Sequence, residues 1–246
     1  MTHRVVITGL GCISPLGNTP ADAWDSAVNG RSGAGPITHW DTTGFDTRIA
    51  AEVKGFDPVA RFGRKEARRM DRFSQMAMAA TEDALKDSGL PITDDNRDRI
   101  GVYIGTGIGG LNTCSDEVTT LVTKGPQRVG PMAVPLMLPD SAAGQVAITF
   151  GIRGPNLAII SACATGNNVI GEAFEAIRAG RVDAMVAGGA EAAIVPVAVA
   201  GFNSMTALSK RNDSPTAASR PFDKNRDGFV MGEGAAIVVL ESEEVA

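Results

Sequence analysis

The residue best placed for covalent chemistry in this 246-residue chain is Cys163, which stands where the hydrophobic period changes. A short β-branched run, Ile159–Ile160, precedes it and predicts a strand. Beyond it, apolar residues recur at helical spacing from Val169 to Ile177, and Gly180 ends the pattern. The sequence therefore predicts a strand, a tight turn and a helix, with the thiol at the turn.

A thiol at this joint would face the free N–H groups of a helix N-terminus. The positive end of the helix favours the thiolate, which is the nucleophilic form of cysteine. The same N–H groups suit the oxyanion of a tetrahedral intermediate, and Ala162, Ala164 and Gly166 leave room for an acyl group. These features predict an acyl-transfer nucleophile. The alternative is a buried structural cysteine, which is the usual environment of a free thiol, and the local pattern leaves both open.

Composition limits the class of protein. A hydrophobic share of 43% and a charged share of 21% are typical of a globular protein, with room for one large or two small domains. The net charge of -5 argues against general nucleic-acid binding, and no apolar run approaches a membrane span. Cys12, Cys114 and Cys163 lack CxxC spacing and suggest neither disulfides nor a zinc site. The chain leads directly into a strand rather than a signal sequence, so we expect a cytoplasmic protein.

The elements that must position Cys163 come from the whole chain. Apolar runs and turn signals predict strands at 4–8, 99–105, 182–189 and 235–240, and helices at 21–28, 71–88 and 140–150. The helix after Cys163 lies between two predicted strands, 159–160 and 182–189. Such a crossover implies parallel pairing between them.

Two glycine-rich segments follow predicted strands. Both partly match a dinucleotide-binding turn, but Ser14 replaces the third glycine of the first, and neither is followed by a strand that ends in an acid. We interpret Gly9–Pro15 as a tight turn. We interpret Gly105–Gly110 as a glycine turn that lets the backbone pass close to a pocket.

Two charged segments each allow a structural and a functional interpretation. Arg64–Arg69 is the one basic cluster, either a solvated helix face or a docking patch for an acidic partner that Arg128 joins. Asp223–Gly234 imitates a calcium loop, but a glycine stands at the position that needs glutamate, so calcium is disfavoured. His3 and His39 have no acid at catalytic or metal spacing and are interpreted as ordinary surface or partly buried residues.

Four motifs in order carry a resemblance to a known family. They are Val5–Gly11, Ser161–Gly166, Val186–Glu191 and Ser219–Val230 with Gly232–Gly234. With them the chain resembles the N-terminal portion of a β-ketoacyl-acyl-carrier-protein synthase II, an elongating condensing enzyme. The resemblance implies an α/β, thiolase-like fold, layered α/β/α with a mixed sheet, of which this is the first of two halves. Residues 1–246 would form one domain with a cap region at about 30–75 and 110–140.

The resemblance also implies roles for residues. Cys163 would carry an acyl chain delivered by acyl carrier protein, and decarboxylation of malonyl-carrier-protein would supply the carbanion that attacks it. Ile108, Ala162 and Phe202 would line the acyl pocket. The residues that would face the acidic carrier protein are Lys65, Arg68, Arg69 and Arg128. The Cys163 strand would pair with its twin in a homodimer, and no cofactor or metal is implied.

The family carries catalytic histidines and a lysine in its second half, which this chain lacks. His3 and His39 cannot be those residues, so we expect the stretch alone to be incapable of complete condensation. One alternative is a non-catalytic fragment that binds carrier protein or dimerises, although Cys163 argues against it. Another is the ketosynthase of a type II polyketide system. Thiolase or hydrolase activity is a less favoured alternative, because the sequence contains no GxSxG motif.

Overall fold

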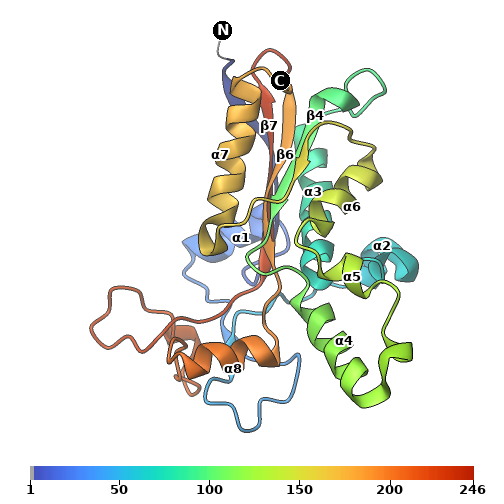
Figure 1. Cartoon of the computed structure of the whole chain (residues 1–246). Coiled ribbons are helices and arrows are strands. Elements are labelled where there is room, and N and C mark those ends of the chain that lie inside the picture. Colours follow the sequence, from blue (N-terminus) through green and yellow to red (C-terminus); the bar gives the residue numbers. More distant parts are fainter. Residues whose placement is uncertain (1–2) are drawn as a thin grey trace.

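A computed structural model describes residues 3–246 of the chain. The predicted direct lead into the first strand includes Met1 and Thr2, which lie outside the described residues. Its centre is a five-stranded mixed sheet with the order β1-β7-β6-β4-β5 (Figure 1). The strands of this sheet are β1 (Val5–Ile13), β4 (Ile100–Gly105), β5 (Asn156–Leu157), β6 (Ala184–Glu191) and β7 (Gly234–Ser242). A separate two-stranded sheet pairs β2 (Gly35–Pro36) with β3 (Ile49–Ala50).

The strands run in both directions. β7 is antiparallel to β1 and to β6, whereas β4 is parallel to β6 and to β5. The prediction that the strands on either side of the Cys163 helix pair with each other is wrong. They are parallel, but β4 lies between them and pairs with both, because the crossover spans one intervening strand.

Helices cover both faces of the sheet, which confirms the layered α/β/α prediction. α3 (Arg72–Ser88) and α6 (Ser141–Phe150) lie on one face and α7 (Thr165–Arg178) on the other (Figure 1). One core joins Phe73, Met76 and other α3 side chains to the sheet, and a second joins Val169 and Ile177 of α7 to the opposite face. The hydrophobic period thus placed the long helices correctly.

The predicted turn at Gly9–Pro15 is wrong, because both glycines lie inside β1 and the chain turns only after Ile13. α3 crosses this strand at very close range. A Cβ on Gly9 would lie 2.1 Å from the carbonyl oxygen of Ala84, and one on Gly11 would lie 1.8 Å from that of Ala80. These glycines allow the helix backbone to approach the strand.

The remaining helices lie beside the sheet and below its lower end (Figure 1). They are α1 (Pro20–Val28), α2 (Pro58–Ala67), α4 (Leu111–Lys124), α5 (Ala133–Met137), α8 (Pro196–Ser204) and the short 3-10 turns η1 (Arg97–Arg99), η2 (Pro126–Arg128), η3 (Ala162–Ala164) and η4 (Pro215–Ala217). The segments 30–75 and 110–140 contain α2, α4 and α5, and their role as a cap stays a prediction. Among residues 3–246, no helix is both long and apolar enough to cross a membrane.

Candidate active site

Cys163 lies at an abrupt change of chain direction. The prediction of a strand at Ile159–Ile160 is wrong, because β5 ends at Leu157 and the next residues are irregular. The N–H of Ser161 donates to the side-chain oxygen of Thr165, 2.9 Å away. This hydrogen bond ties the segment before Cys163 to the first residue of the following helix. The order of strand, turn and helix is therefore retained with a longer turn.

The turn itself is strained. Ala162 has a φ of 52°, in the left-handed region that residues with a side chain seldom adopt. Ala162, Cys163 and Ala164 form a single 3-10 turn, and α7 begins at Thr165. Cys163 is exposed, which argues against the buried structural cysteine. Strained backbone that presents an exposed thiol is typical of a functional nucleophile.

The thiol opens onto a cavity of about 770 Å³ at one end of the central sheet. The cavity lies where β4 and β6 end and where β7 begins. The four residues predicted for the acyl site, Cys163, Ala162, Ile108 and Phe202, all line it, as the sequence reading requires. The structure thus brings them together, and their individual roles stay predictions.

Several lining residues were not singled out from the sequence. The most informative are Cys12, Glu191, Phe229 and Met231. Phe229 packs edge-to-face on Phe202, with ring centroids 5.2 Å apart. Phe229 and Glu191 stand inside two of the quoted motifs, which was a usable signal. Cys12 lies at the cavity because β1 pairs with β7, and Met231 because it stands in the segment that leads into β7. Neither position was visible in the sequence.

Glu191 is a half-buried carboxylate in the wall of the cavity. It accepts hydrogen bonds from the hydroxyl of Thr106 at 3.1 Å and from the N–H of Gly107 at 2.8 Å. Burial raises the pKa of Glu191 above its ordinary value, although these hydrogen bonds and others from the backbone of Ala192 and Ile108 act in the opposite direction.

The raised pKa of Glu191 predicts a dependence of stability on pH. The folded chain binds this proton more tightly than the unfolded chain, so stability falls as the pH rises from the ordinary value of 4.5 through the folded-state pKa. Glu191→Gln cannot ionise and should gain stability relative to the natural chain over that interval. Urea unfolding of both proteins at successive pH values measures this difference, and a difference that stays constant with pH would contradict it.

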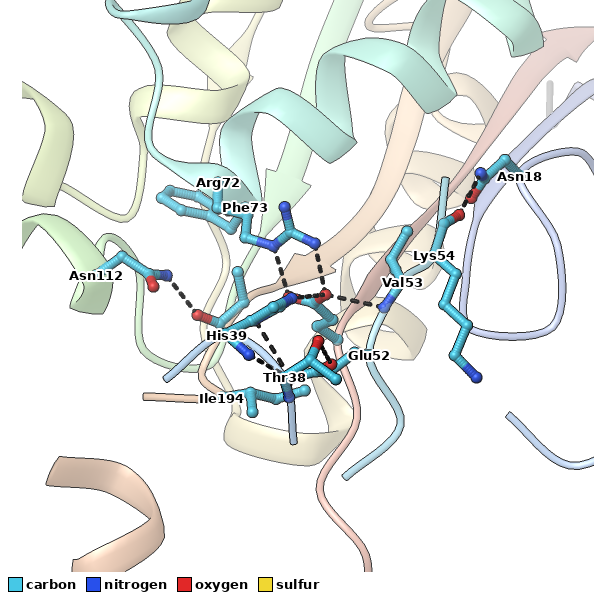
Figure 2. Close-up of polar contacts among 12 residues, drawn as sticks. Asn18, Thr38, His39, Glu52, Val53, Lys54, Arg72, Phe73, Asn112 and Ile194 are labelled. Carbon is cyan, nitrogen blue, oxygen red and sulfur yellow. Dashed lines mark hydrogen bonds and ion pairs between the residues drawn. The ribbon is translucent and has the colours of Figure 1, made fainter. Parts of the chain in front are cut away.

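A second group of charged side chains lies beside residues that line the cavity, and Figure 2 shows their polar contacts. The guanidinium of Arg72 donates two hydrogen bonds, of 2.7 and 2.6 Å, to the carboxylate of Glu233. Glu233 also accepts from the N–H of Val53 at 2.9 Å. The neighbours of Glu233, Gly232 and Gly234, line the cavity. This ion pair therefore ties one wall of the cavity to α3.

The histidines have acidic neighbours that the sequence spacing did not reveal. Nδ1 of His39 lies 3.6 Å from a carboxylate oxygen of Glu52, and its Nε2 lies 3.9 Å from one of Glu233. His3 is 2.9 Å from Glu244. Glu233 and Glu244 are separated from these histidines by most of the chain, so only the fold brings them together, whereas Glu52 is 13 residues from His39. His39 is exposed and His3 is half-buried, in agreement with the expected surface or partly buried positions, and neither histidine lines the cavity.

The predicted basic patch is exposed. Lys65 lies in α2, and Arg68 and Arg69 follow its end. Arg128 is exposed in η2, on a different element, so its membership of the patch stays a prediction. The candidate calcium loop has its acids in use, since Asp223 accepts from Arg220 and Asp227 accepts from Ser209.

Comparison with known proteins gives the family. The family model of the β-ketoacyl synthase N-terminal domain matches residues 2–246. The chain belongs to the β-ketoacyl synthase family. This confirms the resemblance on which the site residues were assigned.

Relatives of this β-ketoacyl synthase chain include the 3-oxoacyl-(acyl-carrier-protein) synthase 2 of Synechocystis sp. and that of Staphylococcus aureus. Each is 51% identical over 243 residues, which is 99% of this chain and 58% of the relative. The chain thus spans less than two thirds of the length of these curated relatives.

Solved structures agree with the fold. A β-ketoacyl synthase from Burkholderia phymatum superposes with a TM-score of 0.87 at 36% identity, covering 99% of this chain and 60% of that one. A chain from a solved complex of a type II polyketide synthase acyl-carrier protein with its ketosynthase superposes with a TM-score of 0.88 at 32% identity, covering 100% of this chain and 60% of that one. The thiolase-like fold expected for the family is confirmed.

Proposed function

We propose that this chain is the acyl-accepting part of a fatty-acid condensing enzyme. In it, an acyl chain held on Cys163 is elongated with malonyl-acyl-carrier-protein by decarboxylative Claisen condensation. The observation that carries the proposal is the exposed thiol on a strained turn that opens onto a cavity with largely apolar walls. An acyl chain needs both a nucleophile and apolar volume beside it.

In the first half-reaction, the thiolate of Cys163 attacks the carbonyl carbon of the acyl thioester. The new Sγ–C bond forms, the bond to the carrier sulfur breaks, and the carrier thiolate takes up a proton. The backbone N–H of Cys163 is the proposed donor to the developing oxyanion from this turn. The saturated chain then lies in the cavity among Ile108, Ala162 and Phe202.

In the second half-reaction, malonyl-carrier-protein loses carbon dioxide and its carbanion attacks the acyl carbonyl carbon, which releases the thiolate of Cys163. Decarboxylation needs donors to the enolate oxygen. Neither His3 nor His39 lines the cavity, so such donors would belong to the part of the relatives' length that this chain does not span.

Acyl carrier protein is the proposed partner, and Lys65, Arg68 and Arg69 are the proposed contacts for its acidic surface, with Arg128 beside them. Their exposure supports this. A homodimer is proposed through β5, which is the edge strand of the sheet and pairs on one side only. We propose a cytoplasmic location, where carrier-protein thioesters would be available.

A polyketide ketosynthase is the second candidate. The solved ketosynthase in complex with a polyketide carrier protein supports it, at 32% identity. The curated synthase 2 relatives are 51% identical, which favours fatty-acid elongation.

The test is intact mass spectrometry of the protein after incubation with an acyl-acyl-carrier-protein thioester. We expect an adduct with the mass of the acyl group, and none on Cys163→Ala. Cys114→Ala is a control that should keep the adduct, because Cys114 does not line the cavity. A folded protein without an adduct would exclude acyl acceptance and favour the non-catalytic binding fragment.

A further inference from the structure

One ionisable group in the cavity wall has no part in the acyl transfer described above. Glu191 is the last residue of β6 and lies beyond Gly189, the last residue of that strand to pair with β4. Its carboxylate therefore extends past the end of β4 and faces the loop Thr106–Gly110, which joins β4 to α4.

The carboxylate of Glu191 holds this loop at consecutive residues. One oxygen accepts from the hydroxyl of Thr106 and the other from the N–H of Gly107. The Thr106 hydroxyl oxygen in turn accepts from the N–H of Gly109 at 3.2 Å. One half-buried carboxylate thus holds Thr106 and Gly107 directly and Gly109 through the Thr106 hydroxyl, and charge-assisted hydrogen bonds of this kind are the strong ones.

The loop is also held very close to the nucleophile. A Cβ added to Gly107 would lie 2.7 Å from a carboxylate oxygen of Glu191 and 3.8 Å from the Cα of Ala162. Ile108 is the next residue in the loop; it lines the cavity and is 46% exposed. Few core contacts restrain such a side chain, so its place depends on how the backbone around it is held.

We propose that Glu191 is a positioning residue that sets the acyl-chain preference of the cavity by fixing the loop that carries Ile108. The proposal rests on the acyl-accepting function assigned to Cys163. With the carboxylate in place, Ile108 stays at one position and limits the depth available to the chain. Without it, the loop relaxes and chains of different length fit with similar ease.

The experiment measures the rate at which Cys163 is acylated by short, medium and long saturated acyl thioesters. The natural protein should prefer one length. Glu191→Ala should reduce the ratio between the best and the worst donor by about 10-fold. Glu52→Ala is the matched control, because the carboxylate of Glu52 likewise accepts from loop N–H groups, at Thr38 and His39, but Glu52 does not line the cavity. This control should keep the natural preference even where it lowers stability.

A second pair of variants keeps the test decisive if Glu191→Ala does not fold. Thr106→Val removes the hydroxyl that links Glu191 to Gly109, whereas Thr106→Ser keeps a hydroxyl at this position. We expect the chain-length preference to flatten in the first and to return in the second. A role in stability alone would shift the unfolding midpoint without changing the ratio between donors.

The outcomes separate the two proposals. Acylation of Cys163 with an unchanged length preference in Glu191→Ala and Thr106→Val would overturn this inference and leave the acyl-accepting function standing. No acylation of the natural protein would overturn both.

Discussion

Arg72→Met is expected to lower the free energy of unfolding by about 3–5 kcal/mol. The side chain of Glu233 is 1% exposed, and its charge is balanced by two short hydrogen bonds from Arg72. Glu52, a second buried carboxylate, stands on the other side of His39 (Figure 2). Methionine keeps the length of the side chain but leaves Glu233 buried without its counter-charge, and an unpaired buried charge is costly.

The measurement is urea unfolding at neutral pH, with Arg31→Met as the matched control. Arg31 and Asp25 form an ion pair of 2.7 Å, but both side chains are exposed. Exposed pairs contribute about 1 kcal/mol or less. Similar losses for the two substitutions would show that burial of Glu233 does not set the energy of its ion pair.

Gly11→Ala is expected to destabilise the chain by about 3 kcal/mol. The added Cβ would lie 1.8 Å from the carbonyl oxygen of Ala80, and both atoms belong to or are fixed to rigid backbone. The clash between the added Cβ and this carbonyl oxygen can be relieved only if α3 moves away from β1. The core contacts of Phe73 and Met76 in α3 would be weakened by that movement.

Gly144→Ala is the control for this prediction. Gly144 lies within α6, and no atom is within 4 Å of an added Cβ. Alanine is favoured over glycine inside a helix, so this substitution should raise stability by up to about 1 kcal/mol. Thermal unfolding of both variants gives the comparison. Equal effects would mean that close approach of α3 does not decide the cost at Gly11.

Local patterns in the sequence were enough to predict the long elements. The helix predicted at 71–88 is α3, with Asp71 as its N-cap and Gly89 in left-handed conformation at its end. These features depend only on nearby residues, since a cap or a helical stripe of apolar side chains is written within a few turns. The strands predicted at 99–105 and 235–240 are β4 and β7 for the same reason.

A glycine can mark a turn or can lie in a strand where another element approaches closely, and the sequence did not distinguish these two cases. Gly9 and Gly11 predicted a turn but stand in β1, where their lack of a side chain admits α3. Strand and helix are about 70 residues apart, so no local signal could report the contact. The same holds for Ile159 and Ile160, whose strand was predicted from β-branching, although the pairing with β4 ends earlier.

For the site, the sequence alone predicted Cys163 as the nucleophile and, through the family resemblance, Ile108, Ala162 and Phe202 as pocket residues; the structure places all four around one cavity. It could do so because a nucleophile at a turn before a helix is encoded by adjacent residues. Only the tertiary structure decided that Glu191 holds the loop of Ile108, and that Arg72 neutralises Glu233. Those partners are separated by 84 and 161 residues, and burial, which gives their charges their energetic weight, exists only once the chain has folded.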